Sequence, residues 1–281
     1  MACTDLPSRR RSEGTTTERF WNGLHRSAVA TKERGHYHEA FLEWLAPTCR
    51  RAESTGPKGE TMPAIIYEDP QILICCKPAG LAVQSASFGK KDLESMIRTY
   101  LMEKEGRANP YLGVVHRLDQ PVEGLVAFAK TPEAAASLSA QVQDGRMKKD
   151  YLAVVCGTLA KPEGRLIHFL KKEASGNVSK AVPEKTPGAK KAVLDYQVVK
   201  EENGMSLVKI RLHTGRHHQI RVQMQAAGAP LYGDAKYNPG AGKDQKLALC
   251  ACRLELIHPK SKKTMRFTCE PEDFIIKNSA Y

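Results

Sequence analysis

An aspartate on a short polar turn is the first residue in this chain whose type and setting could do chemistry. Asp119 lies in residues 115–124. A predicted strand is followed there by a turn that contains the sequence HRLD, and Pro121 shapes the end of this turn. A carboxylate held on a rigid turn beside a strand can act as a nucleophile or as a general base. It can equally be a surface residue that accepts hydrogen bonds from nearby backbone N–H groups. This segment alone leaves both interpretations open.

A second cluster places cations and imidazoles at a predicted strand-to-helix junction, in residues 214–222. We expect Arg216, His217 and His218 to be the first residues of the helix, where free backbone N–H groups favour anions. Two adjacent histidines on a helix cannot both face one metal ion, and no further metal-ligand spacing accompanies them. The cluster therefore predicts phosphate contact rather than a metal site. Arg221 could turn inward and pair with a carboxylate.

The third cluster is residues 147–155, in which Lys148 and Lys149 precede Tyr151 at the start of an apolar strand. An aromatic ring beside cations suits a nucleobase, because the ring offers a stacking face and the cations neutralise phosphate. The alternative is a tyrosine at the end of a strand that packs in the core. That alternative would be preferred if this segment stood by itself.

Together the three clusters resemble the signature motifs of the RluA-type pseudouridine synthase family. The sequence HRLD at 116–119, followed by GL at 124–125 and FAK at 128–130, is similar to the motif around the family's catalytic aspartate. The second and third motifs are matched by KDYLA at 149–153 and TGRHHQIRV at 214–222. Supporting matches are KPAG at 77–80 and GDAKY at 233–237, and the order and spacing fit over residues 62–275.

The resemblance implies isomerisation of uridine to pseudouridine within RNA, in which the base leaves C1′ through N1 and rejoins it through C5. Matching positions make Asp119 the catalytic carboxylate, which either attacks the ribose or removes a ribose proton. Arg221 is implied to pair with Asp119 and to lower the pKa of its carboxyl, because a nearby opposite charge favours the ionised form. Tyr151 is implied to pack on the uracil. Arg117 is implied to fill the space of the displaced base or to hold the RNA backbone.

The implied reaction requires no metal, redox cofactor or nucleotide, and we expect none. The target base must leave its stack, so we expect the nucleotide to be flipped into a pocket. Candidate phosphate contacts are the basic residues near the motifs: Lys148, Lys149, Arg216, His217 and Lys236. Each of them could equally be a solvated surface charge. The expected partner is ribosomal or transfer RNA, without DNA or a membrane, and the protein is expected to be monomeric.

The elements that must position these residues form an α+β pattern in which strands outnumber helices. Strands are predicted near 64–67, 71–76, 113–116, 124–130, 151–155, 192–199, 206–213, 247–257 and 264–269. Asn203-Gly204 is a strong hairpin signal between two of them. We expect a central, mostly antiparallel mixed sheet flanked by helices, with a basic active-site cleft, as in the fold that the resemblance implies.

Helices are predicted where apolar residues recur at helical spacing. These segments are 93–101, the stretch that follows Thr131-Pro132, and 216–227. Thr131 is the expected N-cap of the second helix, and Pro132 suits its first turn. Residues 159–191 are rich in Lys, Gly, Pro and Ser, and we predict that they are irregular and partly mobile.

The balance of charge indicates a polyanionic partner. The chain has 281 residues and a net charge of +12, and proteins this basic commonly bind nucleic acid. The first 60 residues hold 10 Lys and Arg against 8 Asp and Glu, which leaves +10 in the remainder. The basic charge therefore belongs to the part of the chain that carries the motifs.

We divide the chain into an N-terminal extension, residues 1–60, and a catalytic domain, residues 61–281. The extension is expected to be partly disordered, with a short helix near 38–45, a linker at 52–59 and no assignable role. The sequence contains no apolar run long enough to span a membrane, and we expect no secretory signal, because the N-terminal residues lack an apolar segment. The eight cysteines lie mostly in apolar stretches, which predicts buried thiols in a reducing compartment. We expect a cytoplasmic protein, with organellar import left open.

Two other classes of function are compatible with a basic chain. One is a catalytically idle RNA-binding or ribosome-assembly factor on the same scaffold, which the presence of Asp119, Tyr151 and Arg221 disfavours. The other is a DNA-binding regulator, but no helix-turn-helix pattern with an apolar spine is present. Replacing Asp119 distinguishes the enzyme from the idle scaffold, because only the enzyme would lose activity while keeping its affinity for RNA.

Overall fold

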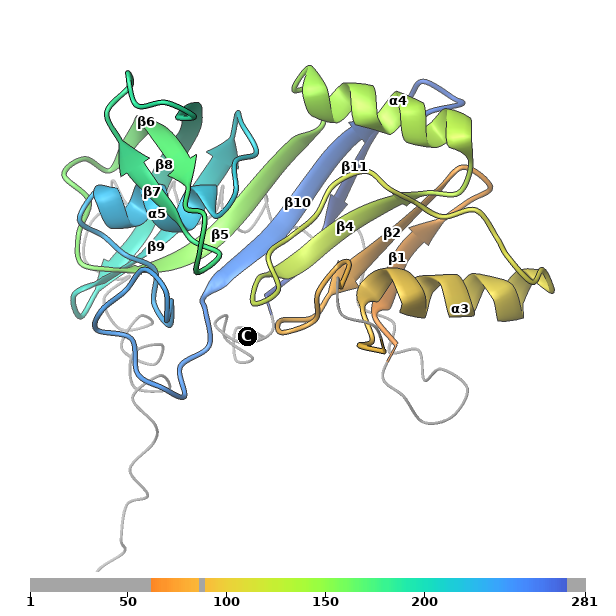
Figure 1. Ribbon diagram of the computed structural model, residues 1–281, viewed down its shortest axis with the longest axis horizontal. Helices are drawn as coiled ribbons and strands as arrows, with labels where there is room; N and C mark the ends of the chain where they lie inside the picture. The colour runs from red at the N-terminus through yellow and green to blue at the C-terminus, as the bar shows by residue number, and fades with distance from the viewer. Residues whose placement is uncertain (1–61, 86–88, 272–281) are drawn as a thin grey trace, which may run out of the picture.

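The computed structural model describes residues 62–85 and 89–271 (Figure 1). The helix and linker predicted within residues 1–60 lie outside these ranges. The strands are β1 (Ala64–Glu68), β2 (Ile72–Lys77), β3 (Gly113–Val114), β4 (Glu123–Ala129), β5 (Lys148–Cys156), β6 (Glu163–Lys172), β7 (Ser179–Val182), β8 (Lys190–Glu202), β9 (Met205–Leu212), β10 (Leu249–Ile257) and β11 (Thr264–Thr268). The helices are α3 (Leu93–Glu105), α4 (Pro132–Gln143) and α5 (Gln219–Ala226).

These strands form one sheet in the order β1-β2-β4-β10-β5-β9-β8-β6-β7, with β3 paired to β4 and β11 paired to β10. The β4–β10 pair is parallel, and the other strand pairs in the described part of the chain are antiparallel. The expected α+β fold with a mostly antiparallel mixed sheet is therefore confirmed. β4 and β10 are the third and fourth strands in this order, and the loop between β3 and β4 leads into them.

Local sequence signals account for several element boundaries. Asp92 caps α3 by accepting from the backbone N–H of Ser95, and Thr131 caps α4 as expected, with Pro132 in its first turn. The loop between β8 and β9 is Asn203-Gly204, with φ of 51° and 72°. Both residues have positive φ, as a tight two-residue hairpin requires.

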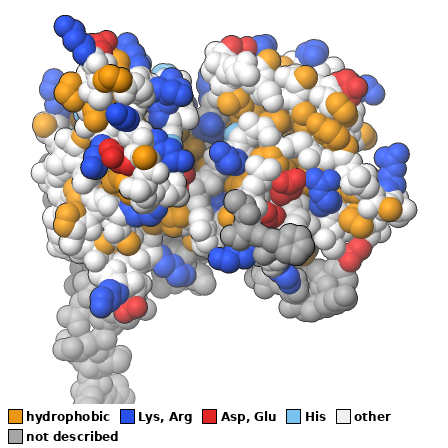
Figure 2. Space-filling view, in the orientation of Figure 1, with side chains coloured by type: hydrophobic (Ala, Val, Ile, Leu, Met, Phe, Trp, Pro, Cys, Tyr) orange, Lys and Arg blue, Asp and Glu red, His pale blue; other side chains and the backbone are white. Residues whose placement is uncertain are grey.

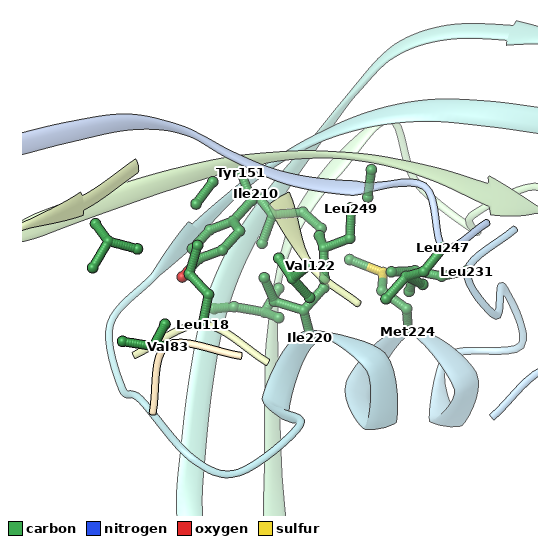
Figure 3. Packing of buried hydrophobic residues seen from close by; sticks show 14 of the residues in the cluster. Val83, Leu118, Val122, Tyr151, Ile210, Ile220, Met224, Leu231, Leu247 and Leu249 are labelled. Atoms are coloured by element: carbon green, nitrogen blue, oxygen red, sulfur yellow. The ribbon is translucent and has the colours of Figure 1, made fainter. Parts of the chain in front are cut away.

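Two apolar clusters lie on the two faces of the sheet, because successive side chains of a strand point to opposite sides. On β5, Tyr151 and Ala153 join one cluster with α3 and α5, whereas Leu152 and Val154 join the other with α4. Figure 3 shows part of the first cluster, in which side chains from α5 meet those of β5 and β10. The cysteines in the described part of the chain are free thiols, and all of them except Cys156 are buried.

The prediction of irregular structure for residues 159–191 is wrong. This segment contains β6, β7 and the start of β8, and β6 pairs with β8 from Glu163 to Leu170. Most side chains of β6 are exposed or half-buried, so its sequence lacks the apolar alternation that marks a strand with one buried face. The strand conformation of β6 therefore depends on hydrogen bonding to β7 and β8 rather than on its own composition.

Gly124 sits where β4 passes closest to β10, beside the loop that carries Asp119. Its φ is +123°, and a Cβ placed there would lie 2.5 Å from the carbonyl oxygen of Ala251. Any side chain would therefore be strained by its backbone conformation and would clash with the backbone of the paired strand.

We expect Gly124→Ala to lower the free energy of unfolding by on the order of 3 kcal/mol, because strain and overpacking add. Urea denaturation followed by circular dichroism measures this loss. Gly215→Ala is the matched control, since a Cβ at Gly215 would meet nothing within 4 Å. Equal stability of the two variants would contradict the close approach of β4 and β10.

Candidate active site

The loop between β3 and β4 holds Asp119 by burying the apolar residues around it. Leu118 and Val122 are buried in the same cluster as Tyr151 and Ile220, and Figure 3 shows these four side chains converging. The Asp119 side chain itself remains 29% exposed. The backbone of the loop is therefore anchored in the core, while the carboxylate reaches the surface.

Lys77 ties this loop to the end of β2. Its Nζ donates to the carbonyl oxygens of Pro78, Leu81 and Gln120 at 2.9, 2.7 and 3.0 Å. The backbone N–H of Gly80 donates to the same Gln120 oxygen at 2.9 Å. Burial lowers the pKa of Lys77 to about 8, which keeps the ammonium protonated at neutral pH. The residue that follows Asp119 is thus fixed from a strand more than 40 positions earlier in the sequence.

Lys77→Met is expected to destabilise the protein by roughly 3 kcal/mol, because three carbonyl oxygens lose their buried donor. The same change frees the Asp119 loop, so the isomerisation rate should fall with it. Thermal melts and single-turnover rates measure the two effects. Lys104→Met is the control, since Lys104 bonds Glu68 at an exposed position. A stability loss no larger than that of the control would exclude the proposed anchor.

Arg221 is buried, as its predicted inward turn requires, but its principal partner differs from the expected one. Its Nε and Nη2 donate to the two oxygens of Asp234 at 2.7 and 2.6 Å. Its Nη1 lies 3.6 Å from Oδ2 of Asp119. The expected contact with Asp119 is present but loose. Asp234 orients the guanidinium through a bidentate pair, in which both partners are geometrically fixed.

Arg221 lowers the pKa of Asp119, as expected, but the resulting pKa is nevertheless above the ordinary value. Burial raises the pKa of this carboxyl above its ordinary value, and the nearby Arg221 offsets that effect only in part. The cause is that desolvation penalises the charged form, while the guanidinium stands beyond hydrogen-bond distance and is already shared with Asp234. Asp119 is consequently a more basic carboxylate than a free aspartate.

The imidazole of His218 also lies close to the carboxylate, and the sequence did not single it out for this position. Its Nε2 lies 3.7 Å from Oδ2 of Asp119. His218 is the N-cap of α5 in a left-handed conformation with φ of 55°, and α5 begins at Gln219. The prediction that residues 216–218 open the helix is therefore wrong. The left-handed residue turns the chain so that the imidazole faces the Asp119 loop.

Tyr151 lies on β5 and is buried, close enough to Asp119 for the carboxylate charge to act on its hydroxyl. The pKa of its hydroxyl is raised by burial and by the negative charge of Asp119, so the phenol is neutral at ordinary pH. A neutral aromatic ring in this position offers an apolar face beside the carboxylate. Asp119, Tyr151 and Arg221 come from three separate segments of the chain, and the structure brings them together.

The other predicted residues lie around this centre with different partners. Arg117 is exposed next to Asp119. Lys148 is exposed and pairs with Glu255 at 3.1 Å, and Lys149 is partly buried, where burial lowers its pKa. Lys148 is therefore paired with a carboxylate at an exposed position, and its contact with phosphate stays a prediction.

The remaining three predicted phosphate contacts gather where α5 meets the β6–β7 hairpin. The Nε of Arg216 donates to the carbonyl oxygen of Lys191 at 3.0 Å. Lys236 donates to the carbonyl oxygen of Asn177 at 3.0 Å, and His217 contacts the side chains of Asn177 and Ser179 at 2.9 Å each. Arg216 and Lys236 are exposed, so their charges face solvent near the site.

Figure 2 shows the surface hollowed between the half that carries β6 to β9 and α5 and the half that carries α3 and α4. Lys and Arg side chains border this groove. Among residues 62–85 and 89–271, no group of three or more His, Cys, Asp or Glu side chains could hold a metal ion. The described helices are too short or too polar to cross a membrane. A carboxylate, an aromatic ring and an arginine beside a basic groove define a site for chemistry on a polyanion.

Comparison with known proteins agrees with this geometry. Residues 71–226 match the family described as RNA pseudouridylate synthase. The chain is 35% identical over 233 residues to the ribosomal large subunit pseudouridine synthase D of Pseudomonas aeruginosa, covering 75% of this chain and 69% of that protein. It is 33% identical to the dual-specificity RNA pseudouridine synthase RluA of Yersinia pestis, covering 74% of this chain and 98% of that protein.

A solved structure shares the fold at lower sequence identity. The human RNA pseudouridylate synthase domain containing 4 protein superposes with a TM-score of 0.63 at 21% identity, covering 75% of this chain and 89% of that chain. The chain therefore belongs to the RNA pseudouridylate synthase family and is an RNA pseudouridine synthase of the RluA type. Its reaction class is the isomerisation of uridine in RNA.

Proposed function

We propose that this enzyme acts on a uridine flipped out of structured ribosomal or transfer RNA, with Asp119 as the catalytic carboxylate. The observation that supports this proposal is that Asp119 lies close to a buried aromatic residue, Tyr151, and to a buried cation, Arg221. Residues 119 and 221 are about 100 positions apart in the sequence. We further propose that the enzyme works as a monomer in the cytoplasm.

In the proposed reaction the N1–C1′ bond of the uridine breaks, the uracil turns, and C5 forms the new bond to C1′. The proton at C5 is lost, and N1 ends with a proton, so the product is an isomer of the substrate. Asp119 serves either as nucleophile at the ribose or as base toward a ribose proton, and its raised pKa suits both roles. The ring of Tyr151 supports the detached uracil while it turns.

The residues at the edge of the groove are proposed to hold the RNA. Arg117 is exposed two positions before Asp119, where it can fill the space left by the displaced base or contact the RNA backbone. Arg216 and Lys236 present exposed charge where α5 meets the β6–β7 hairpin. We do not favour an idle RNA-binding scaffold, because binding alone would not require a buried arginine aimed at a carboxylate.

The test of this proposal is tritium release from ribosomal and transfer RNA labelled at C5 of uridine, followed by mapping of the new pseudouridine. Release of tritium accompanied by one or a few reproducible sites supports the reaction and names the target. RNA retained by the protein without any tritium release, across both RNA classes, would instead favour the idle scaffold.

RNA affinity is expected to fall steeply with salt. The net charge outside the first 60 residues is +10, and each neutralised phosphate contributes about −0.7 to the slope of log K against log salt for single strands. Filter binding of full-length protein between low and physiological salt measures the slope. Deleting residues 1–58 should leave most of the affinity, and a slope near zero or complete loss on deletion would contradict the assignment of binding to residues 61–281.

A further inference from the structure

The hydroxyl of Tyr237 connects β7 to the histidine that faces Asp119. The backbone N–H of Ser179 donates to this hydroxyl oxygen at 2.8 Å. The same oxygen lies 2.7 Å from Nδ1 of His218. Among the described residues, these two groups are the hydrogen-bond partners of the Tyr237 hydroxyl. Both Tyr237 and His218 are buried.

The direction of these hydrogen bonds determines where the imidazole carries its proton. A tyrosine hydroxyl has one O–H to donate, and a buried O–H without an acceptor is costly. Since Ser179 occupies the oxygen as a donor, the acceptor available to the O–H is Nδ1 of His218. That nitrogen must then be unprotonated, so a neutral His218 carries its hydrogen on Nε2.

The surroundings of His218 keep the ring neutral. Burial lowers the pKa of His218 to about 3, and the positive charge of Arg221 acts in the same direction, followed by His217, Lys236 and Lys172. The ring of His217 stacks on that of His218 at 3.8 Å between centroids. A protonated His218 would place a second cation against Arg221, at a site with little access to water.

From this geometry we infer that His218 is a positioning residue, which presents a neutral Nε2–H to the catalytic carboxylate with its tautomer fixed by Tyr237. The inference rests on the proposed role of Asp119. Oδ2 of Asp119 faces both Nε2 of His218, at 3.7 Å, and Nη1 of Arg221, at 3.6 Å. Both distances are longer than a hydrogen bond. They can shorten when RNA binds, as contacts in active sites commonly do.

A neutral donor has a specific advantage beside a reactive carboxylate. It fixes the direction of Oδ2 without adding a second full positive charge to that of Arg221, which would stabilise the carboxylate further and make it a poorer nucleophile or base. The left-handed backbone of His218, with φ of 55°, is a conformation that a residue with a Cβ adopts infrequently and that occurs often at functional sites. It directs the ring between Tyr237 and Asp119.

Nuclear magnetic resonance of the full-length protein tests the tautomer without reference to activity. Two-bond ¹H–¹⁵N spectra separate the two neutral tautomers and the imidazolium of each histidine, and His218→Gln assigns the signal. We expect His218 as the Nε2–H tautomer from pH 6 to 8. We also expect a mixed or inverted tautomer in Tyr237→Phe. A protonated ring at pH 7, or an Nδ1–H tautomer in the unchanged protein, would overturn the inference.

Single-turnover rates at saturating enzyme test the positioning role. His218→Leu should lower the rate roughly 100-fold, whereas His218→Gln, whose amide keeps an N–H near the Nε2 position, should stay within about 10-fold. RNA affinity should change little in either variant. His213→Gln is the control. The His213 imidazole has a different partner, since its Nε2 lies 2.6 Å from Oδ2 of Asp195 at an exposed position.

The outcomes separate this inference from the proposed function. Equal rates for His218→Leu and His218→Gln, with both folded, would show that the N–H contributes nothing and would refute the positioning role alone. Full activity of Asp119→Asn would refute the proposed role of Asp119, whatever the state of His218. Loss of folding in His218→Leu leaves the spectroscopic experiment to decide, since that experiment uses the unchanged protein.

Discussion

Replacing Asp119 by asparagine is expected to lower the isomerisation rate by at least roughly 10³-fold, as removal of a central nucleophile or base does in other enzymes. The amide keeps the shape of the side chain but can neither attack the ribose nor accept a proton. Tritium release from uridine-labelled RNA measures the loss. RNA affinity should be retained, because Arg117, Arg216 and the other basic residues near the groove are unchanged.

The same substitution should not destabilise the protein. The pKa of Asp119 is raised in the folded state, so the folded state favours the protonated carboxyl. As pH rises above about 3.9, the pKa of an aspartate in the unfolded chain, the free energy of unfolding therefore decreases. At neutral pH an uncharged asparagine avoids this penalty. We therefore expect Asp119→Asn to be at least as stable as the unchanged enzyme in denaturant titrations at pH 7.

The raised pKa also fixes the direction of the pH dependence. Activity requires the ionised carboxylate, so the rate should fall as pH decreases through a value above that of an ordinary aspartate. The single-turnover rate, measured as a function of pH with the RNA bound, gives the apparent pKa of this fall, the acid limb of the pH profile. A limb at or below the ordinary aspartate value would mean that Arg221 outweighs burial, contrary to the site described here.

Asp195→Asn is the matched control for Asp119→Asn. Asp195 is also a carboxylate beside an arginine, Arg165, and a histidine, His213, but it lies on the exposed side of β8. Its replacement should leave the rate unchanged. Substantial residual activity in a clean preparation of Asp119→Asn, above a few per cent, would falsify the catalytic assignment.

Arg221→Met is expected to lower the bound-state rate by orders of magnitude and to destabilise the fold. Asp234 would lose its bidentate partner while its side chain is 0% exposed, and an uncompensated buried charge costs about 3–5 kcal/mol. Asp119 would lose the cation that offsets its burial, so its pKa would rise further. Single-turnover kinetics and chemical denaturation measure the two losses.

A second pair of variants separates the catalytic from the structural effect of Arg221. In Asp234→Asn the guanidinium keeps its charge but loses its rigid holder, so the rate should fall less than in Arg221→Met. Arg216→Met should weaken RNA binding with a smaller effect on the bound-state rate, since Arg216 is exposed and bonds a backbone carbonyl. If Arg221→Met and Arg216→Met behave alike at saturating enzyme, Arg221 is a phosphate contact and does not act through Asp119.

The local features of this protein can be predicted from its amino-acid sequence. The turn that carries Asp119, the hairpin at Asn203-Gly204 and the Thr131 cap follow from residue types within a few positions of each other. The same local motifs identified the family and so the reaction class. Local signals are readable because they depend on backbone conformation and short-range hydrogen bonds, which sequence neighbours supply.

The tertiary structure decided which groups share the site and in what charge state. Pairing of Arg221 with Asp234, and the contact of Tyr237 with His218, depend on side chains that different loops bring together. The pKa of Asp119 is raised because desolvation exceeds the attraction of a shared arginine 3.6 Å away, and neither burial nor that distance is written in a local motif. The β6 strand likewise depends on its pairing with β8, since most of its side chains are exposed or half-buried and its apolar residues come in adjacent pairs, Leu166-Ile167 and Phe169-Leu170.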